Sequence, residues 1–272
     1  MQDFNYHTHT YRCGHADPYL TDEDYVLEFI KQGFKRICFT DHSPEKNRID
    51  LRNNMRMDYS QKDEYLESIK FLKNKYRNKI KIETGFEVEY LPFDVNNLLE
   101  LKKDVDKLVL GQHFICNRDG KLRIFRQADF TDSELLLYAK YIDDALSKGI
   151  PDIIAHPDIY MLNRNIFGKI ETKVANLICA SAEKYNVPLE INLAQPCLYY
   201  EHKRKNIIYP CPQFWQIASN YNVKVVYGID AHFKEQISYF KESVEIANSH
   251  IGYETIKKLH FVNENLQWHR LH

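Results

Sequence analysis

Short runs of β-branched and aromatic residues alternate with longer amphipathic stretches along nearly the whole chain. The short runs predict seven β-strands, at residues 4–9, 36–42, 81–90, 107–116, 152–158, 188–194 and 224–232. Apolar positions spaced by three and four residues predict helices at residues 21–33, 60–76, 97–104, 131–149, 169–185, 213–220 and 235–250. A tight turn is expected at residues 118–120 inside a local hairpin, and residues 195–212 are expected to be irregular.

The regular alternation of strands and helices predicts βαβ units and therefore a parallel sheet. Seven such units in a chain of 272 residues suit a closed or nearly closed α/β barrel, formed as one domain over residues 1–272. The alternative is an open, doubly wound sheet, which usually carries a glycine-rich phosphate turn after its first strand. The chain has only 9 glycines and contains neither G-x-G-x-x-G nor G-x-x-x-x-G-K, so we expect the barrel.

Composition narrows the range of partners. Lys and Arg total 37, and Asp and Glu total 38, which gives a formal net charge of −1. Such a balance offers no strong field to attract nucleic acid or an anionic membrane, so neither partner is expected. The sequence shows no signal-peptide pattern and no apolar run near the roughly 20 residues that span a bilayer. None of the six cysteines forms a C-x-x-C pair, so we expect reduced thiols and a cytoplasmic protein, with the oligomeric state left open.

The unusual feature is where the 12 histidines stand. Polar groups whose burial costs free energy lie at or near the C-terminal ends of six of the seven predicted strands. They are His7, His9, His42, Glu87, His113, His156, Asp230 and His232. A parallel barrel opens all these ends onto one mouth, so the groups should converge there. Residues two apart on a strand face the same side, which should bring His7 to His9 and Asp230 to His232.

Imidazole nitrogens and carboxylate oxygens are the ligands of zinc, iron and manganese sites. His15, in the loop after the first strand where Gly14 allows a tight turn, raises the number of candidate ligands to nine. One ion of roughly four or five ligands cannot use nine, so two ions are the minimum and three are expected if Glu87 bridges. The other histidines end no predicted strand and are expected to be surface groups, with His202 undecided; they are His202, His250, His260, His269 and His272.

At this point the sequence resembles the PHP (polymerase and histidinol-phosphatase) superfamily. The motifs that carry the resemblance are His7-Thr8-His9 with Gly14-His15, Thr40-Asp41-His42-Ser43, Gly85-Phe86-Glu87, Gly111-Gln112-His113, Ala155-His156-Pro157 and Gly228-Ile229-Asp230-Ala231-His232. Their order and spacing span nearly the whole chain and resemble the histidinol-phosphatase branch, as does Glu190-Ile191-Asn192 on the sixth strand.

The resemblance implies a distorted (β/α)7 barrel, TIM-like in outline, with three divalent metal ions. It implies that one ion is held by His7, His9, Glu87 and Asp230. It places a second ion on Glu87, His113 and His156, and a third on His15, His42 and His232. Zinc is the expected ion, and manganese or iron would suit the same ligands.

The implied activity is the hydrolysis of L-histidinol phosphate to L-histidinol and phosphate in histidine biosynthesis, by attack of metal-bound hydroxide on phosphorus. Asp41 is expected to orient a ligand or move a proton beside His42. An anionic ester also needs cations beyond the metals, and we expect Arg164 and Arg204 to clamp it, with Arg12 also at the mouth. Either Glu89 or Glu201 would meet a cationic amine or imidazole of the substrate, and the sequence does not choose between them.

Three other hypotheses about the function remain open from the sequence. A metal-dependent amidohydrolase also begins with H-x-H after its first strand, but His15 and His42 would then be surplus. A PHP phosphoesterase or nuclease could act on another substrate, although the balanced charge disfavours a nucleic-acid enzyme. A non-catalytic metal-binding or scaffold protein would need closed coordination shells without exchangeable water.

Overall fold

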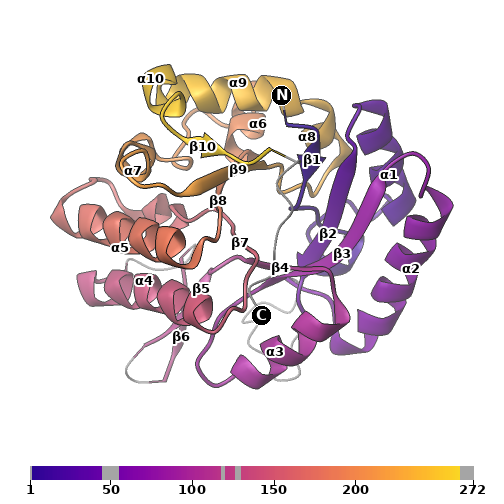
Figure 1. The fold of residues 1–272 in the computed structure, drawn as a ribbon, viewed down its shortest axis with the longest axis horizontal. Helices are drawn as coiled ribbons and strands as arrows, with labels where there is room; N and C mark the ends of the chain where they lie inside the picture. The colour runs from indigo at the N-terminus through magenta and orange to yellow at the C-terminus, as the bar shows by residue number, and fades with distance from the viewer. Residues whose placement is uncertain (1, 45–54, 118–119, 126–129, 264–272) are drawn as a thin grey trace.

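Parallel strands form one strongly curved sheet with helices around its outside in this computed structural model (Figure 1). The structure describes residues 2–44, 55–117, 120–125 and 130–263. The strands follow the order β1 (Phe4–Asn5), β2 (Arg36–His42), β3 (Lys81–Val88), β4 (Lys107–Leu110), β7 (Ile153–Ile154), β8 (Leu189–Asn192), β9 (Lys224–Gly228) and β10 (His260–Phe261). Each neighbouring pair in this order is parallel, as the predicted βαβ units require.

Helices follow most strands and lie on the outer face of the sheet (Figure 1). The α-helices are α1 (Asp22–Lys31), α2 (Lys62–Lys75), α3 (Val95–Asp104), α4 (Asp132–Ser147), α5 (Lys169–Tyr185), α6 (Ala194–Tyr200), α7 (Pro212–Ala218), α8 (Lys234–Ser238), α9 (Phe240–Ile251) and α10 (Tyr253–Ile256). In the described part of the chain, 3₁₀ turns stand between a strand and the next helix at η1 (Tyr11–Cys13), η2 (Tyr59–Gln61) and η3 (Ile159–Asn163). Within the described ranges, none of these helices is both long enough and apolar enough to cross a bilayer.

The C-terminal ends of β1 and β9 meet and close the ring of seven strands. Thr8 forms a parallel bridge with Ala231. The His9 amide donates to the Ala231 carbonyl at 2.9 Å, and the Ala231 amide donates to the His7 carbonyl at 3.3 Å. The predicted (β/α)7 barrel is therefore confirmed, and its seam lies beside the histidines.

At the N-terminal ends the seam is made by side chains, because the backbones of β1 and β9 do not pair there. Asn5 accepts from the Ile229 amide at 2.9 Å and donates to the His7 carbonyl at 2.8 Å. The Gln2 side chain accepts from the Tyr227 amide at 3.0 Å and donates to the Tyr227 carbonyl at 2.7 Å. At these N-terminal ends β9 pairs with β10 instead of β1, and this extra strand distorts the barrel.

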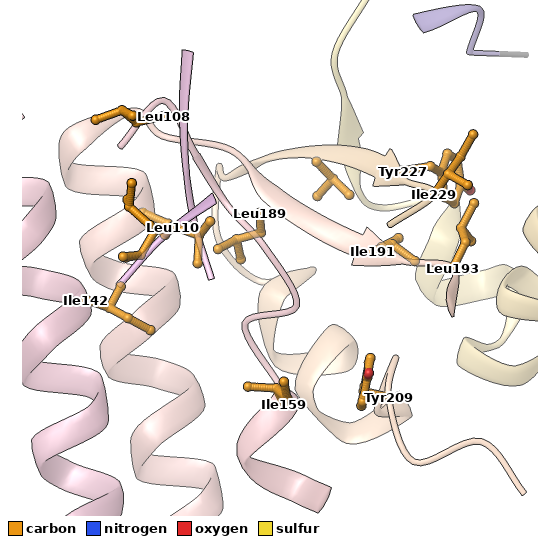
Figure 2. Close-up of a cluster of buried hydrophobic side chains, with 14 of the residues drawn as sticks. Leu108, Leu110, Ile142, Ile159, Leu189, Ile191, Leu193, Tyr209, Tyr227 and Ile229 are labelled. Atoms are coloured by element: carbon orange, nitrogen blue, oxygen red, sulfur yellow. The ribbon is translucent and has the colours of Figure 1, made fainter. Parts of the chain in front are cut away.

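Apolar side chains fill both sides of the sheet, but the inner cluster occupies only part of the barrel. The larger cluster lies between the strands and the helices; Figure 2 shows part of it, with Leu108 and Leu110 of β4, Leu189 of β8 and Ile142 of α4. The smaller cluster consists of Phe4, Tyr6, Cys38, Val109, Ile153, Ala155, Val226 and Val262. These inner residues make the barrel a packed core rather than a pore, and the polar ring lies beyond them at the strand ends.

Most strands end earlier than the sequence predicts, whereas β2 ends at His42 as predicted. β4 stops at Leu110, and the rest of the predicted strand 107–116 forms a separate hairpin of β5 (Phe114–Cys116) and β6 (Leu122–Ile124); of its expected turn, residues 118 and 119 lie outside the described residues. The expectation that residues 195–212 are irregular was wrong at its start, where α6 forms. His156 has a φ of 28° and Asp230 a φ of 54°, so the chain leaves the extended conformation before these residues. Two-residue alternation is therefore the wrong reason for the meeting of Asp230 and His232.

We predict that the side-chain seam contributes measurably to stability. Replacing Asn5 with alanine should lower the free energy of unfolding by about 1–3 kcal/mol, because it leaves the buried Ile229 amide without a partner and removes one of the two hydrogen bonds to the His7 carbonyl. Denaturant unfolding measures this, with Asn96→Ala on the exposed side of α3 as the matched control. A loss below about 0.5 kcal/mol in Asn5→Ala would show that the seam does not depend on this amide.

Candidate metal centre

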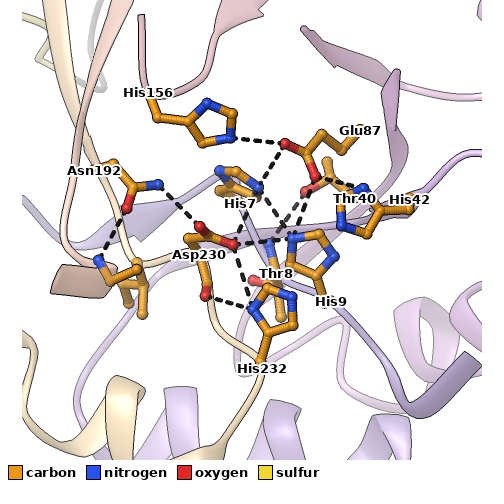
Figure 3. A network of polar contacts seen from close by, with 12 residues as sticks. His7, Thr8, His9, Thr40, His42, Glu87, His156, Asn192, Asp230 and His232 are labelled. Atoms are coloured by element: carbon orange, nitrogen blue, oxygen red, sulfur yellow. Dashed lines mark hydrogen bonds and ion pairs between the residues drawn. The ribbon is translucent and has the colours of Figure 1, made fainter. Parts of the chain in front are cut away.

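All nine residues predicted as ligands lie together at the C-terminal ends of the strands, and Glu87 of β3 lies within 4 Å of five of their imidazoles. Figure 3 labels most of the group, namely His7, His9, His42, Glu87, His156, Asp230 and His232. Glu87 Oε1 is 3.0 Å from His156 Nε2, 3.5 Å from His7 Nε2 and 3.8 Å from His113 Nε2. Its other oxygen, Oε2, is 2.9 Å from His42 Nδ1. The Glu87 carboxylate thus faces these four imidazoles, each at or just beyond the C-terminal end of a different strand.

Asp230 forms a second point of convergence after β9. Its Oδ1 is 3.1 Å from His9 Nε2, 3.5 Å from His7 Nε2 and 3.4 Å from His232 Nδ1. Beyond it, His232 Nε2 and His15 Nε2 are 2.8 Å apart. The 3₁₀ turn η1 carries His15 back to the mouth, and Gly14 ends that turn with a φ of 76°, which confirms the predicted role of this glycine.

The ligand atoms fall into compact groups whose members lie within 4.8 Å of one another. The groups built from the predicted ligands are His7, His9 and Asp230; His7, Glu87 and His156; His9, His42 and Glu87; and His15, His42 and His232. The last group matches the third ligand set implied by the family resemblance, and the first holds three of the four residues of the first set. His113 joins none of these groups and reaches the centre through its 3.8 Å approach to Glu87.

Burial and charge set the protonation of these groups. Burial disfavours the charge of Glu87, but the neighbouring His42 and His7 outweigh it and hold the pKa of the carboxyl well below its usual value. Burial also lowers the pKa of His42 and of His232 well below the ordinary value. Burial opposes the charge of His7 and His9 as well, but Glu190 beside His7 and Asp230 beside His9 outweigh it and hold the pKa of both imidazoles well above the ordinary value. Two ionised carboxylates, Glu87 and Asp230, therefore face both protonated and neutral imidazoles, and a metal ion that binds here would displace the ring protons.

The residues present fit divalent ions. Glu87 Oε2 and His9 Nδ1 are buried without a well-aligned hydrogen bond. Imidazole nitrogens also face each other at short range, at 3.1 Å between His7 and His9 and 2.8 Å between His15 and His232. Facing nitrogens can share only one proton, whereas a metal ion satisfies both lone pairs. Buried carboxylates of this kind are costly unless a cation compensates them.

Two glycines provide the space in which the central carboxylates lie. A Cβ on Gly111 would lie 1.8 Å from Glu87 Oε1, and a Cβ on Gly228 would lie 2.0 Å from Glu190 Oε2. Both distances are far inside van der Waals contact, so neither position accepts a side chain while the carboxylate stays in place. Gly111 and Gly228 are required here for clearance rather than for an unusual backbone conformation.

An outer layer of carboxylates orients the imidazoles, and sequence reasoning missed its importance. Glu190 Oε2 is 2.8 Å from His7 Nδ1, and Glu89 Oε1 is 2.7 Å from His113 Nδ1. When each Nδ1–H donates a hydrogen bond to its carboxylate, the Nε2 atom of the same ring carries a free lone pair that points at the centre. Glu89 is thus engaged by His113, which argues against its suggested role toward a cationic substrate. The available signal was a second glutamate two residues after Glu87, within the predicted strand 81–90.

Asp41 lies behind His9 rather than beside the His42 imidazole. Its Oδ1 accepts from the His42 backbone amide at 2.8 Å and is 3.4 Å from His9 Nδ1. Its Oδ2 accepts from the Thr10 hydroxyl. The geometry gives Asp41 an orienting position toward His9, and its proposed part in proton movement stays a prediction.

The arginines expected at the mouth are held by protein groups. Arg12 is buried and bonds Asp22 at 2.8 Å and Glu64 at 2.7 Å, so its expected place among the substrate cations was wrong. Arg164 bonds Glu171 at 2.6 Å and Asp132 at 3.2 Å, at the N-terminal ends of α5 and α4. Arg204 is partly exposed and donates from Nε to the Asn206 carbonyl. For Arg164 and Arg204, a role as clamps stays a prediction.

Another cation lies beside the carboxylate that orients His113. Arg56 places Nη2 4.0 Å from Glu89 Oε1 and donates from Nη1 to the Ser43 carbonyl at 3.1 Å. Among the histidines left out of the site, His202 and His260 are exposed and His250 is partly buried. The remaining two, His269 and His272, lie outside the described residues.

The sequence matches the family model of the PHP domain over residues 5–194. The chain belongs to the PHP domain family. A probable phosphatase of Thermoanaerobacter sp. is 27% identical over 244 residues, which cover 88% of this chain and 83% of that protein. A probable histidinol-phosphatase of Deinococcus radiodurans is 24% identical over 257 residues, covering 88% of this chain and 90% of that protein. The predicted family is therefore confirmed.

Solved structures agree with the PHP fold. A histidinol phosphatase candidate from Listeria monocytogenes superposes with a TM-score of 0.71 at 22% identity, covering 88% of this chain and 99% of that one. The histidinol phosphate phosphatase of Lactococcus lactis, solved with zinc, L-histidinol and phosphate, superposes with a TM-score of 0.65 at 16% identity. That match covers 96% of this chain and 95% of the other. At these identities the two structures establish the shared fold.

We predict that Gly111→Ala removes bound metal from an otherwise folded PHP domain. The added Cβ must displace Glu87, and with it the carboxylate on which the groups converge. Metal content after dialysis should fall at least about tenfold, the scale seen when the support of a metal ligand is lost. The control is Gly168→Ala, whose Cβ would meet only the end of Glu171 at 3.3 Å. Equal metal content in both variants would contradict the clearance role of Gly111.

Proposed function

We propose that this PHP protein is a metal-dependent phosphomonoesterase that hydrolyses L-histidinol phosphate to L-histidinol and phosphate. The observation that carries the proposal is the convergence of nine nitrogen- and oxygen-donor residues around Glu87 at the barrel mouth. The names of the relatives support a phosphatase, and the ligands of the Lactococcus lactis structure support histidinol phosphate as the ester.

The donor set would hold three ions, with zinc as the proposed metal. His7, His9 and Asp230 would hold one with Glu87, and His113 and His156 would hold a second with Glu87. His15, His42 and His232 would hold the third. When bound, such ions lower the pKa of a coordinated water and stabilise charge on the phosphoryl oxygens.

The protein's own groups prepare the site for this chemistry. Glu190 and Glu89 fix the imidazoles of His7 and His113 with Nε2 facing inward, so little reorganisation is needed when the ions bind. Asn192 donates to Asp230 Oδ2 at 3.1 Å and to Glu190 Oε1 at 2.8 Å, which links the carboxylates after β8 and β9. The inner apolar cluster fills the barrel on the side away from the mouth, and we expect substrate and water to approach from the mouth.

Electrostatics of the loaded centre favour a small anion. The near-zero net charge of the chain counts no metal, and three divalent ions would add about six positive charges beside two ligand carboxylates. A phosphate monoester dianion would be attracted to this mouth without a basic surface elsewhere. The water oxygen would attack phosphorus as the ester oxygen leaves, and L-histidinol would depart with a proton on that oxygen.

The first test of the proposal measures phosphate release from L-histidinol phosphate against a panel of other phosphomonoesters, with metal content determined on the same sample. We expect a strong preference for histidinol phosphate, and we expect His9→Ala to lose bound metal and turnover together because His9 contacts Asp230 and Glu87.

A preference for another ester would keep the centre and reject this substrate. Activity on amides or lactones alone would indicate an amidohydrolase. Salt-sensitive binding of single-stranded DNA would indicate a nuclease, and metal-replete protein without hydrolase activity would indicate a scaffold. Full activity in a folded, metal-poor His9→Ala protein would contradict metal-dependent catalysis altogether.

The second test concerns the proposed phosphate clamps. Replacing Arg204 or Arg164 with alanine should raise KM for histidinol phosphate about tenfold or more, since a hydrogen bond to a charged group contributes roughly 1.5–3 kcal/mol. Steady-state kinetics measures the effect, with Lys205→Ala, an exposed neighbour of Arg204, as the control. Unchanged KM and kcat in either arginine variant would remove that residue from the clamp.

A further inference from the structure

Cys13 lies inside the metal centre, although it was not among the predicted ligands. It is the last residue of η1, between His9 and His15, and its side chain is 0% exposed. The turn is fixed on both sides, because Arg12 is tied to Asp22 and Glu64 and the Gly14 amide donates to the Tyr11 carbonyl. The sulfur is therefore held beside the histidines by the same turn that presents His15.

The sulfur belongs to a group of potential ligands in its own right. Cys13 Sγ, one ring nitrogen of His9 and one of His232 all lie within 4.8 Å of one another. The rings of His9 and His232 are stacked at 4.0 Å, and the His15 ring is 4.5 Å from that of His232. None of the other five cysteines, all of which lie in described parts of the chain, belongs to such a group.

A second observation at the same place points to a ligand. His232 Nε2 and His15 Nε2 face each other at 2.8 Å, and two facing ring nitrogens can share only one proton. A metal ion would satisfy both lone pairs, and Cys13 Sγ lies within 4.8 Å of a ring nitrogen of His232. The structure therefore marks one place where a metal ion would bind sulfur and nitrogen together.

We propose that Cys13 supplies a thiolate ligand to the outer ion, the one that shares His232. The proposal rests on the proposed metal centre. On binding, the thiol proton passes to solvent and a sulfur–metal bond forms, with no change in oxidation state. Zinc and other thiophilic ions bind well to mixed sulfur and nitrogen ligands, whereas magnesium and manganese prefer oxygen. Cys13 thus selects a zinc-like ion at this position of the centre.

X-ray absorption at the zinc edge tests the proposal on the zinc-loaded full-length protein. A zinc–sulfur distance of about 2.3 Å should be present in wild type and absent in Cys13→Ser. Cys116→Ser, which changes a partly exposed cysteine of β5 outside the group, is the matched control and should keep the sulfur signal. Cobalt substitution gives a second readout, since a thiolate ligand produces a near-ultraviolet charge-transfer band that Cys13→Ser should lose.

The outcomes separate this inference from the proposed function. Three bound zinc ions with only nitrogen and oxygen neighbours in wild type would overturn the role of Cys13 and leave the phosphatase proposal standing. A sulfur signal that persists in folded Cys13→Ser would also overturn it. Protein that retains no zinc would contradict the proposed metal centre itself. If Cys13→Ser does not fold, the wild-type spectrum and the Cys116→Ser control still decide the question.

Discussion

The rest of the site depends on the burial of one carboxylate, Glu87. A charge at this depth is costly, and the surrounding imidazoles hold it ionised. Gly111 leaves the space that the carboxylate fills, and His156 and His42 approach its two oxygens from opposite sides. Each of these features has a local physical reason, and together they create a place that fits more than one divalent cation.

The hydrogen bonds that close the barrel also bring the residues of the metal centre together. The hydrogen bonds that join β1 to β9 run between His9 and Ala231 and between Ala231 and His7. The same contacts bring the ligands that follow the first strand to Asp230. Because side chains of Asn5 and Gln2 complete the seam below, a distorted barrel can stay closed where its backbones no longer pair.

Much of the site could be predicted from the sequence. Burying a polar residue at the end of an apolar strand costs free energy, and eight such residues at one end of a sheet indicate a common ligand. The barrel was predicted from the alternation of strands and helices, and the family from the motifs at the strand ends; both are confirmed. The strand alternation used to align Asp230 with His232 failed, since a positive φ at Asp230 ends the extended chain. The orienting role of Glu190 and the burial of Arg12 depend on contacts between distant elements, which no local pattern records.

We propose that Glu87 would serve as a ligand to more than one metal ion. Anomalous diffraction from crystals of the zinc-loaded protein, recorded on both sides of the zinc edge, tests it most directly. We expect three zinc peaks at the barrel mouth, two of them within bonding distance of Glu87. A single peak, or peaks that leave Glu87 without a metal, would contradict it.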